Sequence, residues 1–102
     1  MIHVIALVTA KPGRREDILR EFAWVLPVIR AEKGCIEFVP VVDVEDAGAP
    51  YAPLGSDAFA VVEKWETLAD LRAHGASPHM AAYGAKVKDM IAARSVHVAS
   101  AV

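Results

Sequence analysis

The sequence predicts an α+β domain in which strands and helices follow the order βαββαβ. Four short runs are rich in β-branched and other apolar residues, as buried strands are, and the segments between them include stretches that repeat apolar residues every three or four positions, as amphipathic helices do. A chain of 102 residues is long enough for one hydrophobic core only, so residues 1–102 are treated as a single domain.

The first strand is expected at residues 3–9, where both alternating faces are apolar. Residues 14–33 follow as an amphipathic helix that Gly34 ends and that Pro27 kinks. Trp24 lies well off the apolar stripe of this helix. We expect Trp24 to pack either against a partner or under a loop, and the sequence does not choose between the two.

Two more strands are expected at residues 35–44 and 59–65. The segment between them, residues 45–57, is rich in glycine and proline and is long for a loop in so small a domain, which favours a functional or disordered segment. Tyr51 and Leu54 would anchor this loop, either as a lid or as an arm that reaches a second subunit.

Two helices and a last strand complete the chain. A variant of the capping box at residues 67–70 begins a short helix. Ser77 and Pro78 suit the N-cap and the first position of a longer helix, whose three- and four-residue apolar spacing continues to Arg94. Residues 95–102 form the final strand.

This order is that of the ferredoxin-like fold, in which helices cover one face of an antiparallel sheet. The opposite face is also apolar here, and 55% of all residues are hydrophobic, which is high for so small a domain. Two such sheets packed face to face would bury that surface. We therefore expect a homodimer that forms a dimeric α+β barrel.

Composition argues against several classes of function. The net charge is −2 and the charges are spread evenly, so there is no basic stripe for nucleic acid. No apolar run reaches the roughly 18 residues of a membrane span, and the first run ends in a Lys-Pro-Gly turn, so we expect no membrane partner and a cytoplasmic location. The single cysteine and the spacing of the four histidines predict no metal site, although the fold can still assemble one.

The candidate site is the corner where the third strand meets the second helix. Glu63 and Trp65 share one face of the strand because side chains alternate with a period of two. His74 lies in the last turn of the short helix, where the helix dipole favours the imidazolium, and His79 lies in the first turn of the longer helix, where the dipole favours the neutral ring. Either histidine is a candidate base.

Each of these residues also has a structural interpretation. Trp65 can simply fill the core, and either histidine can simply decorate a helix end. A carboxylate in an apolar strand is exposed at the rim, paired or functional, so Glu63 is expected to have a basic partner or a role in the site. The candidate partners on the long helix are Lys86, Lys88 and Arg94.

This corner resembles the antibiotic biosynthesis monooxygenase family, and most closely its branch of quinol monooxygenases. The matching residues are Glu63, Trp65, Glu66, Leu68, Leu71, His74, Ser77, Pro78, His79 and Tyr83. The resemblance implies a dimeric ferredoxin-like barrel with a pocket between sheet and helices in each subunit. It also implies oxidation of an aromatic substrate with O2 and with no cofactor. Haem-degrading members use an active-site Asn, and this chain contains neither Asn nor Gln, which argues against haem as the substrate.

We therefore predict a cofactor-independent monooxygenase that oxidises a quinol or a related polycyclic phenol with O2. Such a reaction needs an apolar pocket and a base that deprotonates the substrate. The candidate catalytic residues are His79, His74 and Glu63, and the candidate substrate-binding residues are Trp65 and Tyr83 as ring-stacking walls and Met80 and Met90 as a pliable lining. The alternative is a non-catalytic or non-oxygenase barrel of the same shape, such as a small-molecule-binding or stress-related protein.

Overall fold

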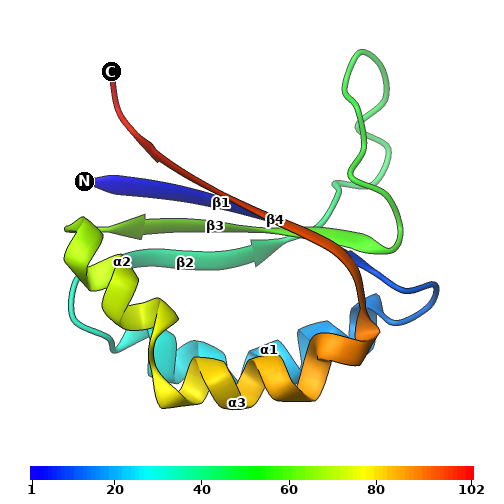
Figure 1. The fold of residues 1–102 in the computed structure, drawn as a ribbon. Coiled ribbons are helices and arrows are strands. Elements are labelled where there is room, and N and C mark those ends of the chain that lie inside the picture. The colour runs from blue at the N-terminus through cyan, green and yellow to red at the C-terminus, as the bar shows by residue number, and fades with distance from the viewer.

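The computed structural model describes all 102 residues and confirms the predicted order of strands and helices. The elements are β1 (Ile2–Ala10), α1 (Arg15–Arg30), β2 (Cys35–Val41), β3 (Ala58–Trp65), α2 (Leu68–Gly75), α3 (Pro78–Val87), the 3-10 turn η1 (Lys88–Met90) and β4 (Ile91–Ser100). The strands form one antiparallel sheet in the order β2-β3-β1-β4 (Figure 1). This arrangement is the predicted ferredoxin-like fold.

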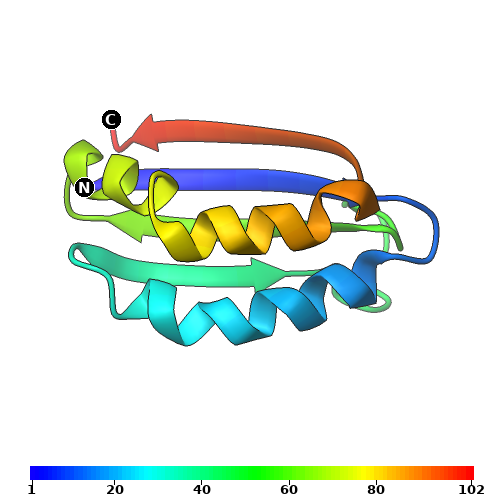
Figure 2. The same ribbon diagram turned by 60° about the horizontal axis from the view of Figure 1, so that its bottom comes forward.

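All the helices cover the same face of the sheet (Figures 1 and 2). Along β1, the side chains that face the helices, such as Val4 and Val8, are buried. On the opposite face, Ile5 and Leu7 are 48% and 38% exposed. The buried residues of α1 are Ile18, Phe22, Val25 and Ile29, which follow the three- and four-residue spacing of the predicted amphipathic helix. The core therefore lies between the sheet and the helix layer, and the second apolar face of the sheet is open in the single chain.

The two predicted helix starts use their polar residues differently. Thr67 Oγ1 accepts a hydrogen bond from the Asp70 N–H over 3.1 Å, so the predicted cap of α2 is confirmed. Ser77 has the extended backbone of an N-cap and precedes Pro78, yet its hydroxyl makes no cap bond to α3. Ser77 Oγ instead donates to the His74 carbonyl over 2.7 Å, which fastens the end of α2 to the start of α3.

The boundary between α3 and β4 differs from the prediction. The predicted helix ran to Arg94, but α3 ends at Val87 and β4 already begins at Ile91. The Lys11 N–H donates to the Met90 carbonyl over 2.8 Å, and Ile91 pairs with Ala10 of β1. The backbone after Met90 therefore bonds to β1 and no longer to the helix. Arg94 therefore lies on β4 and not on the long helix.

The long loop begins earlier than predicted, because β2 ends at Val41 together with its ladder to β3. The Asp43 carboxylate accepts hydrogen bonds from the N–H groups of Leu54 (2.8 Å) and Gly55 (2.9 Å), which fold the loop back on itself. Figure 1 shows the loop projecting from the end of the sheet on the side opposite the helices. In this position the loop does not cover the helix side as a lid would, and the arm that reaches a second subunit stays a prediction.

The outer surface of α1 carries Trp24, which is 78% exposed. No loop of the same chain covers it, so of the two predicted contacts only one with a partner stays open. None of the helices combines the length and apolar character needed to cross a membrane.

Candidate active site

A cavity of about 600 Å³ lies between the sheet and the helices α2 and α3. Strands β1, β3 and β4 supply one wall, and most of the lining is apolar. Figure 2 shows β4 at the edge of the sheet, beyond the edge of the helix layer. The lining residues Val96 and Val98 on this strand are about half exposed, so the cavity opens along β4. Its volume falls in the range of small-molecule pockets, roughly 300–1,000 Å³.

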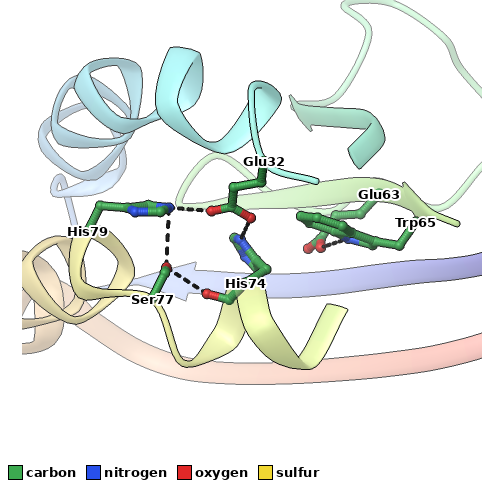
Figure 3. Close-up of polar contacts among 6 residues, drawn as sticks. All are labelled: Glu32, Glu63, Trp65, His74, Ser77 and His79. Carbon is green, nitrogen blue, oxygen red and sulfur yellow. Dashed lines mark hydrogen bonds and ion pairs between the residues drawn. The ribbon is translucent and has the colours of Figure 1, made fainter. Parts of the chain in front are cut away.

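Glu63 and Trp65 lie side by side on β3 and face the helices, as the strand period predicted (Figure 3). The Trp65 indole N–H donates to Glu63 Oε1 over 2.9 Å, and both side chains are buried. Burial raises the pKa of Glu63 above its ordinary value, against the opposing effects of the indole hydrogen bond and of nearby positive charge. Glu63 lines the cavity, whereas Trp65 lies behind it in the core.

The partner of Glu63 is thus the indole and not a basic side chain. Lys86 pairs with Glu21 on the helix surface over 3.6 Å. Neither Lys88 nor Arg94 forms an ion pair. The predicted ion pair with a residue of the long helix is therefore wrong, because the helix ends early and the neighbouring indole on the same strand face already binds one oxygen of the carboxyl group.

The two histidines of the corner meet at one carboxylate, that of Glu32 (Figure 3). His74 Nδ1 lies 2.9 Å from Glu32 Oε2, and His79 Nε2 is in direct contact with Glu32 Oε1. Glu32 follows the end of α1, and its side chain is largely buried. The antiparallel pairing of Cys35 with Trp65 brings this end of α1 to the corner between β3 and α2.

The hydrogen bonds assign the tautomers of both rings. Glu32 accepts from His74 Nδ1–H and from His79 Nε2–H, and Ser77 Oγ, which donates to the His74 carbonyl, accepts a second contact from His79 Nε2 over 3.2 Å. His74 Nε2 has no hydrogen-bond partner in the protein. Every fully buried polar side-chain atom does have a partner, so Nε2 must be at least partly exposed. Because His74 lines the cavity, we assign this nitrogen as a free acceptor that opens to it.

Aromatic contacts fix the orientation of His74. Its ring centroid lies 4.9 Å from that of Trp65 and 5.2 Å from that of Phe38. Tyr83 on α3 also lines the cavity, and its ring packs edge-on against Phe22 with the ring centroids 4.9 Å apart. Burial raises the pKa of Tyr83, so this phenol stays protonated at neutral pH and can donate a hydrogen bond.

Comparison with known proteins identifies the family. The family model for antibiotic biosynthesis monooxygenase matches residues 1–86, which include the whole corner. The chain belongs to the antibiotic biosynthesis monooxygenase family. Within it, the protein named "Probable quinol monooxygenase YgiN" from Escherichia coli (strain K12) is 34% identical over 100 residues, which are 96% of this chain and 95% of that protein.

Solved structures related to this family member share its fold. PA3566 from Pseudomonas aeruginosa superposes with a TM-score of 0.81 at 24% identity, covering 99% of this chain and 93% of that one. Rv0793 from Mycobacterium tuberculosis gives a TM-score of 0.81 at 20% identity, covering 99% and 94%. At these identities the likeness concerns the fold alone.

The structure of this antibiotic biosynthesis monooxygenase family member divides the predicted site residues into two groups. Those that line the cavity are Glu63, His74, Met80 and Tyr83. Trp65, His79 and Met90 do not line it. Trp65 donates a hydrogen bond to Glu63, and His79 donates one to Glu32. Met90 packs against the core from η1. Sequence analysis missed Glu32; the signal for it lay in the topology, because the chain turns from α1 into β2 beside the end of β3.

The cluster of Glu32, His74 and His79 has the composition of a metal site. Single ligand atoms of Glu32, His74 and His79 lie within 4.8 Å of one another. Two histidines and a carboxylate are the ligand set of several zinc and iron sites. In the structure these groups already satisfy one another by hydrogen bonds, and a metal ion would have to replace those bonds.

Proposed function

We propose that this protein is a monooxygenase that oxidises a quinol or a related phenol with O2, and that His74 is its base. One observation carries the proposal: His74 lines an apolar cavity while a largely buried carboxylate holds its Nδ1, which leaves Nε2 as the nitrogen without a protein partner. The name of the Escherichia coli relative supports the choice of a quinol. The apolar lining suits an aromatic ring.

The first step is a proton transfer. A quinol hydroxyl gives its proton to His74 Nε2, and the Glu32 carboxylate at Nδ1 stabilises the imidazolium that forms. Such positioned general base catalysis contributes about 10²- to 10⁴-fold to a rate. The resulting quinolate is electron-rich enough to reduce O2 directly, so the substrate itself is the reductant.

The remaining steps balance without a further reactant. The quinolate transfers one electron to O2, and the semiquinone and superoxide combine at a ring carbon to form a C–O bond. The imidazolium of His74 returns its proton to the peroxide oxygen. Loss of the ring hydrogen from the same carbon then breaks the O–O bond, releases one oxygen atom as water and leaves the other as a carbonyl, which is a hydroxyquinone after tautomerisation. An apolar cavity protects the radical pair from water.

Glu63 is proposed to hold a substrate hydroxyl. Its burial favours the protonated acid, which can donate one hydrogen bond and accept others. Since Trp65 occupies Oε1, the second carboxyl oxygen is the one that remains for the cavity. The role of Trp65 in this proposal is to hold Glu63, and the role of His79 is to hold Glu32.

We also propose that two chains form a homodimer through the open sheet face. The middle of that face is apolar, because Ile5 and Leu7 of β1 are exposed there and pair with Val62 and Ala60 of β3, and exposed apolar surface is costly in water. The cavity lies on the opposite, helix-covered side and stays accessible in such a dimer. The loop from residue 42 to 57 projects on the dimer side, where it can contact the second subunit.

Oxygen consumption with 1,4-dihydroxynaphthalene and ¹⁸O2 tests the reaction. We expect enzyme-dependent O2 uptake above the rate in buffer and one ¹⁸O atom in the quinone product. His74→Ala should lower kcat by about 10²-fold or more, because it removes the base. His79→Ala should cost less, since it removes only a support of Glu32. Uptake no faster than in buffer, together with tight anaerobic binding of the quinol, would instead establish a binding protein of the same fold.

A further inference from the structure

The cavity has two chemically different ends. Glu63 and the ring of His74 form one end, and the cations Lys88 and Arg94 are the remaining charged groups of the lining. The register of the sheet separates the two ends, because Val4 of β1 pairs with Glu63 and Val8 pairs with Arg94. Four residues along a strand span about 13 Å.

The helices also place His74 and Lys88 at opposite ends of the cavity. His74 belongs to α2, which precedes α3, and Lys88 belongs to η1, which follows α3. Figure 2 shows α2 and η1 at opposite ends of α3. Between the two ends, the row of the sheet centred on Ala6 is apolar, since it pairs with Val61 and Val96 and all three line the cavity.

The two cations have no partner of their own. Most of the basic residues on α1 and α3, such as Arg20 and Lys86, form ion pairs on the surface, but neither Lys88 nor Arg94 does. Glu63 is the single acidic residue of the lining, and its carboxyl group is bound to the Trp65 indole. The positive charge of Arg94 nevertheless reaches the interior, because it opposes the rise in the pKa of both Glu63 and Tyr83.

We propose that the cavity selects aromatic substrates that carry an anionic group, and that Lys88 and Arg94 bind this group. This inference rests on the proposed function, which places the reaction at His74 and Glu63, and it adds the class of substrate. A guanidinium binds a carboxylate through two parallel hydrogen bonds, and beside an apolar wall this contact is stronger than in bulk water. Because the ends are separated by more than one ring, a fused ring system or a ring with a short substituent fits.

The anionic group would also orient the substrate. A carboxylate at Lys88 and Arg94 places the distal phenolic hydroxyl at His74 and Glu63, where the proton is removed. The reverse orientation would take the carboxylate away from both cations into the end of the cavity that has no cation, and is disfavoured. A neutral quinol of the same size has no such preference between the two orientations.

Anaerobic binding of a matched pair of ligands tests the proposal without depending on catalysis. The probes are 1,4-dihydroxynaphthalene-6-carboxylate and the corresponding 6-carboxamide, which has the same shape and no charge. Isothermal titration of the full-length protein should give a Kd about tenfold lower for the carboxylate, the effect of one or two charged hydrogen bonds at a partly exposed site. The preference should shrink as salt is raised to about 1 M, where screening acts within roughly 3 Å.

Variants locate the effect. Arg94→Gln combined with Lys88→Gln should bring the two Kd values together, by weakening binding of the carboxylate much more than binding of the carboxamide. Lys86→Gln removes one positive charge from α3 outside the cavity and should preserve the preference. All three residues are exposed, so the substitutions remove no core packing, and carboxamide binding reports that the cavity is intact.

Two results would overturn the inference: equal affinity for the two probes in the wild type, or a preference that survives in the double variant. The proposed function fails separately. If the carboxylate binds tightly and selectively but no O2 is consumed when air is admitted, the charge-selective site stands and the oxygenase reaction does not. If O2 is consumed equally with both probes at equal affinity, the reaction stands and the inference is wrong.

Discussion

The carboxylate of Glu32 holds Nδ1 of His74 at 2.9 Å, and His74 lines the cavity. A histidine held in this way keeps one tautomer and one orientation, and the carboxylate stabilises the imidazolium once the ring accepts a proton. Glu32 does not line the cavity itself. It is therefore a positioning residue that acts through His74.

Replacing Glu32 by Gln should lower kcat with little change in KM. The amide keeps the shape of the carboxylate but cannot stabilise an imidazolium, and its NH2 group turns His74 toward the tautomer whose Nε2 carries a proton and cannot accept one. The comparable change in a Ser-His-Asp triad costs about 10⁴-fold, and here we expect about 10²-fold or more. Steady-state oxygen uptake measures both constants.

The matched control is Glu21→Gln, which removes a carboxylate that pairs only with Lys86 on the surface. It should leave kcat within about twofold. Glu32→Asp, which retains the charge on a shorter side chain, should restore part of the activity. An unchanged kcat in Glu32→Gln would show that His74 does not depend on this carboxylate.

Local patterns in the sequence predicted which residues share the strand face of the site. They did not predict that the Glu32 carboxylate belongs to it. The period of two placed Glu63 and Trp65 together, and the structure joins them by a hydrogen bond. Glu32 is 42 residues from His74 and 47 from His79 along the chain, and no local rule links positions so far apart. Only the register of β2 on β3 brings them together.

The end of α3 shows a different limit. Met90 and Ile91 continue the apolar spacing of the helix, and both do pack against the core, so the spacing correctly predicted their burial. They reach the core from η1 and β4, because pairing with β1 begins at Ile91. Hydrophobic periodicity reports which residues are buried, and in a short window it does not distinguish a helix from a turn followed by a strand. This is why Arg94 was assigned to the wrong element.

Glu63 should make the stability of the protein depend on pH. Its pKa is raised in the folded state, so folding favours the protonated carboxyl group, and that contribution is complete below the unfolded pKa, near 4.5, and is lost as pH rises through the folded value. Glu63→Gln is neutral at every pH and lacks this loss. The melting temperature of the variant, measured relative to that of the wild type, should therefore rise between pH 4 and pH 7. A difference that does not vary with pH would mean that burial does not raise this pKa.

The open sheet face should control the oligomeric state. Leu7→Lys places a charge in the open sheet face, and sedimentation velocity at micromolar concentration should show a monomer for this variant and a dimer for the wild type. Ala85→Lys adds the same charge at an exposed position of α3 and should remain dimeric. A wild-type protein that sediments as a monomer would contradict the proposed barrel.

The hydrogen bond between Trp65 and Glu63 should appear as a coupling energy in unfolding. Trp65→Phe removes the indole N–H and leaves a buried carboxyl group without its donor, which costs about 1–3 kcal/mol in addition to lost packing. Glu63→Leu leaves the indole N–H unsatisfied at a similar cost. The double variant removes both partners, so its loss of unfolding free energy should be smaller than the sum of the single losses by about 0.5–3 kcal/mol. Urea denaturation at one fixed protein concentration measures all three values, because association with a second chain would otherwise shift them. Additive losses would mean that the hydrogen bond contributes nothing, and that Trp65 stabilises the site through packing alone.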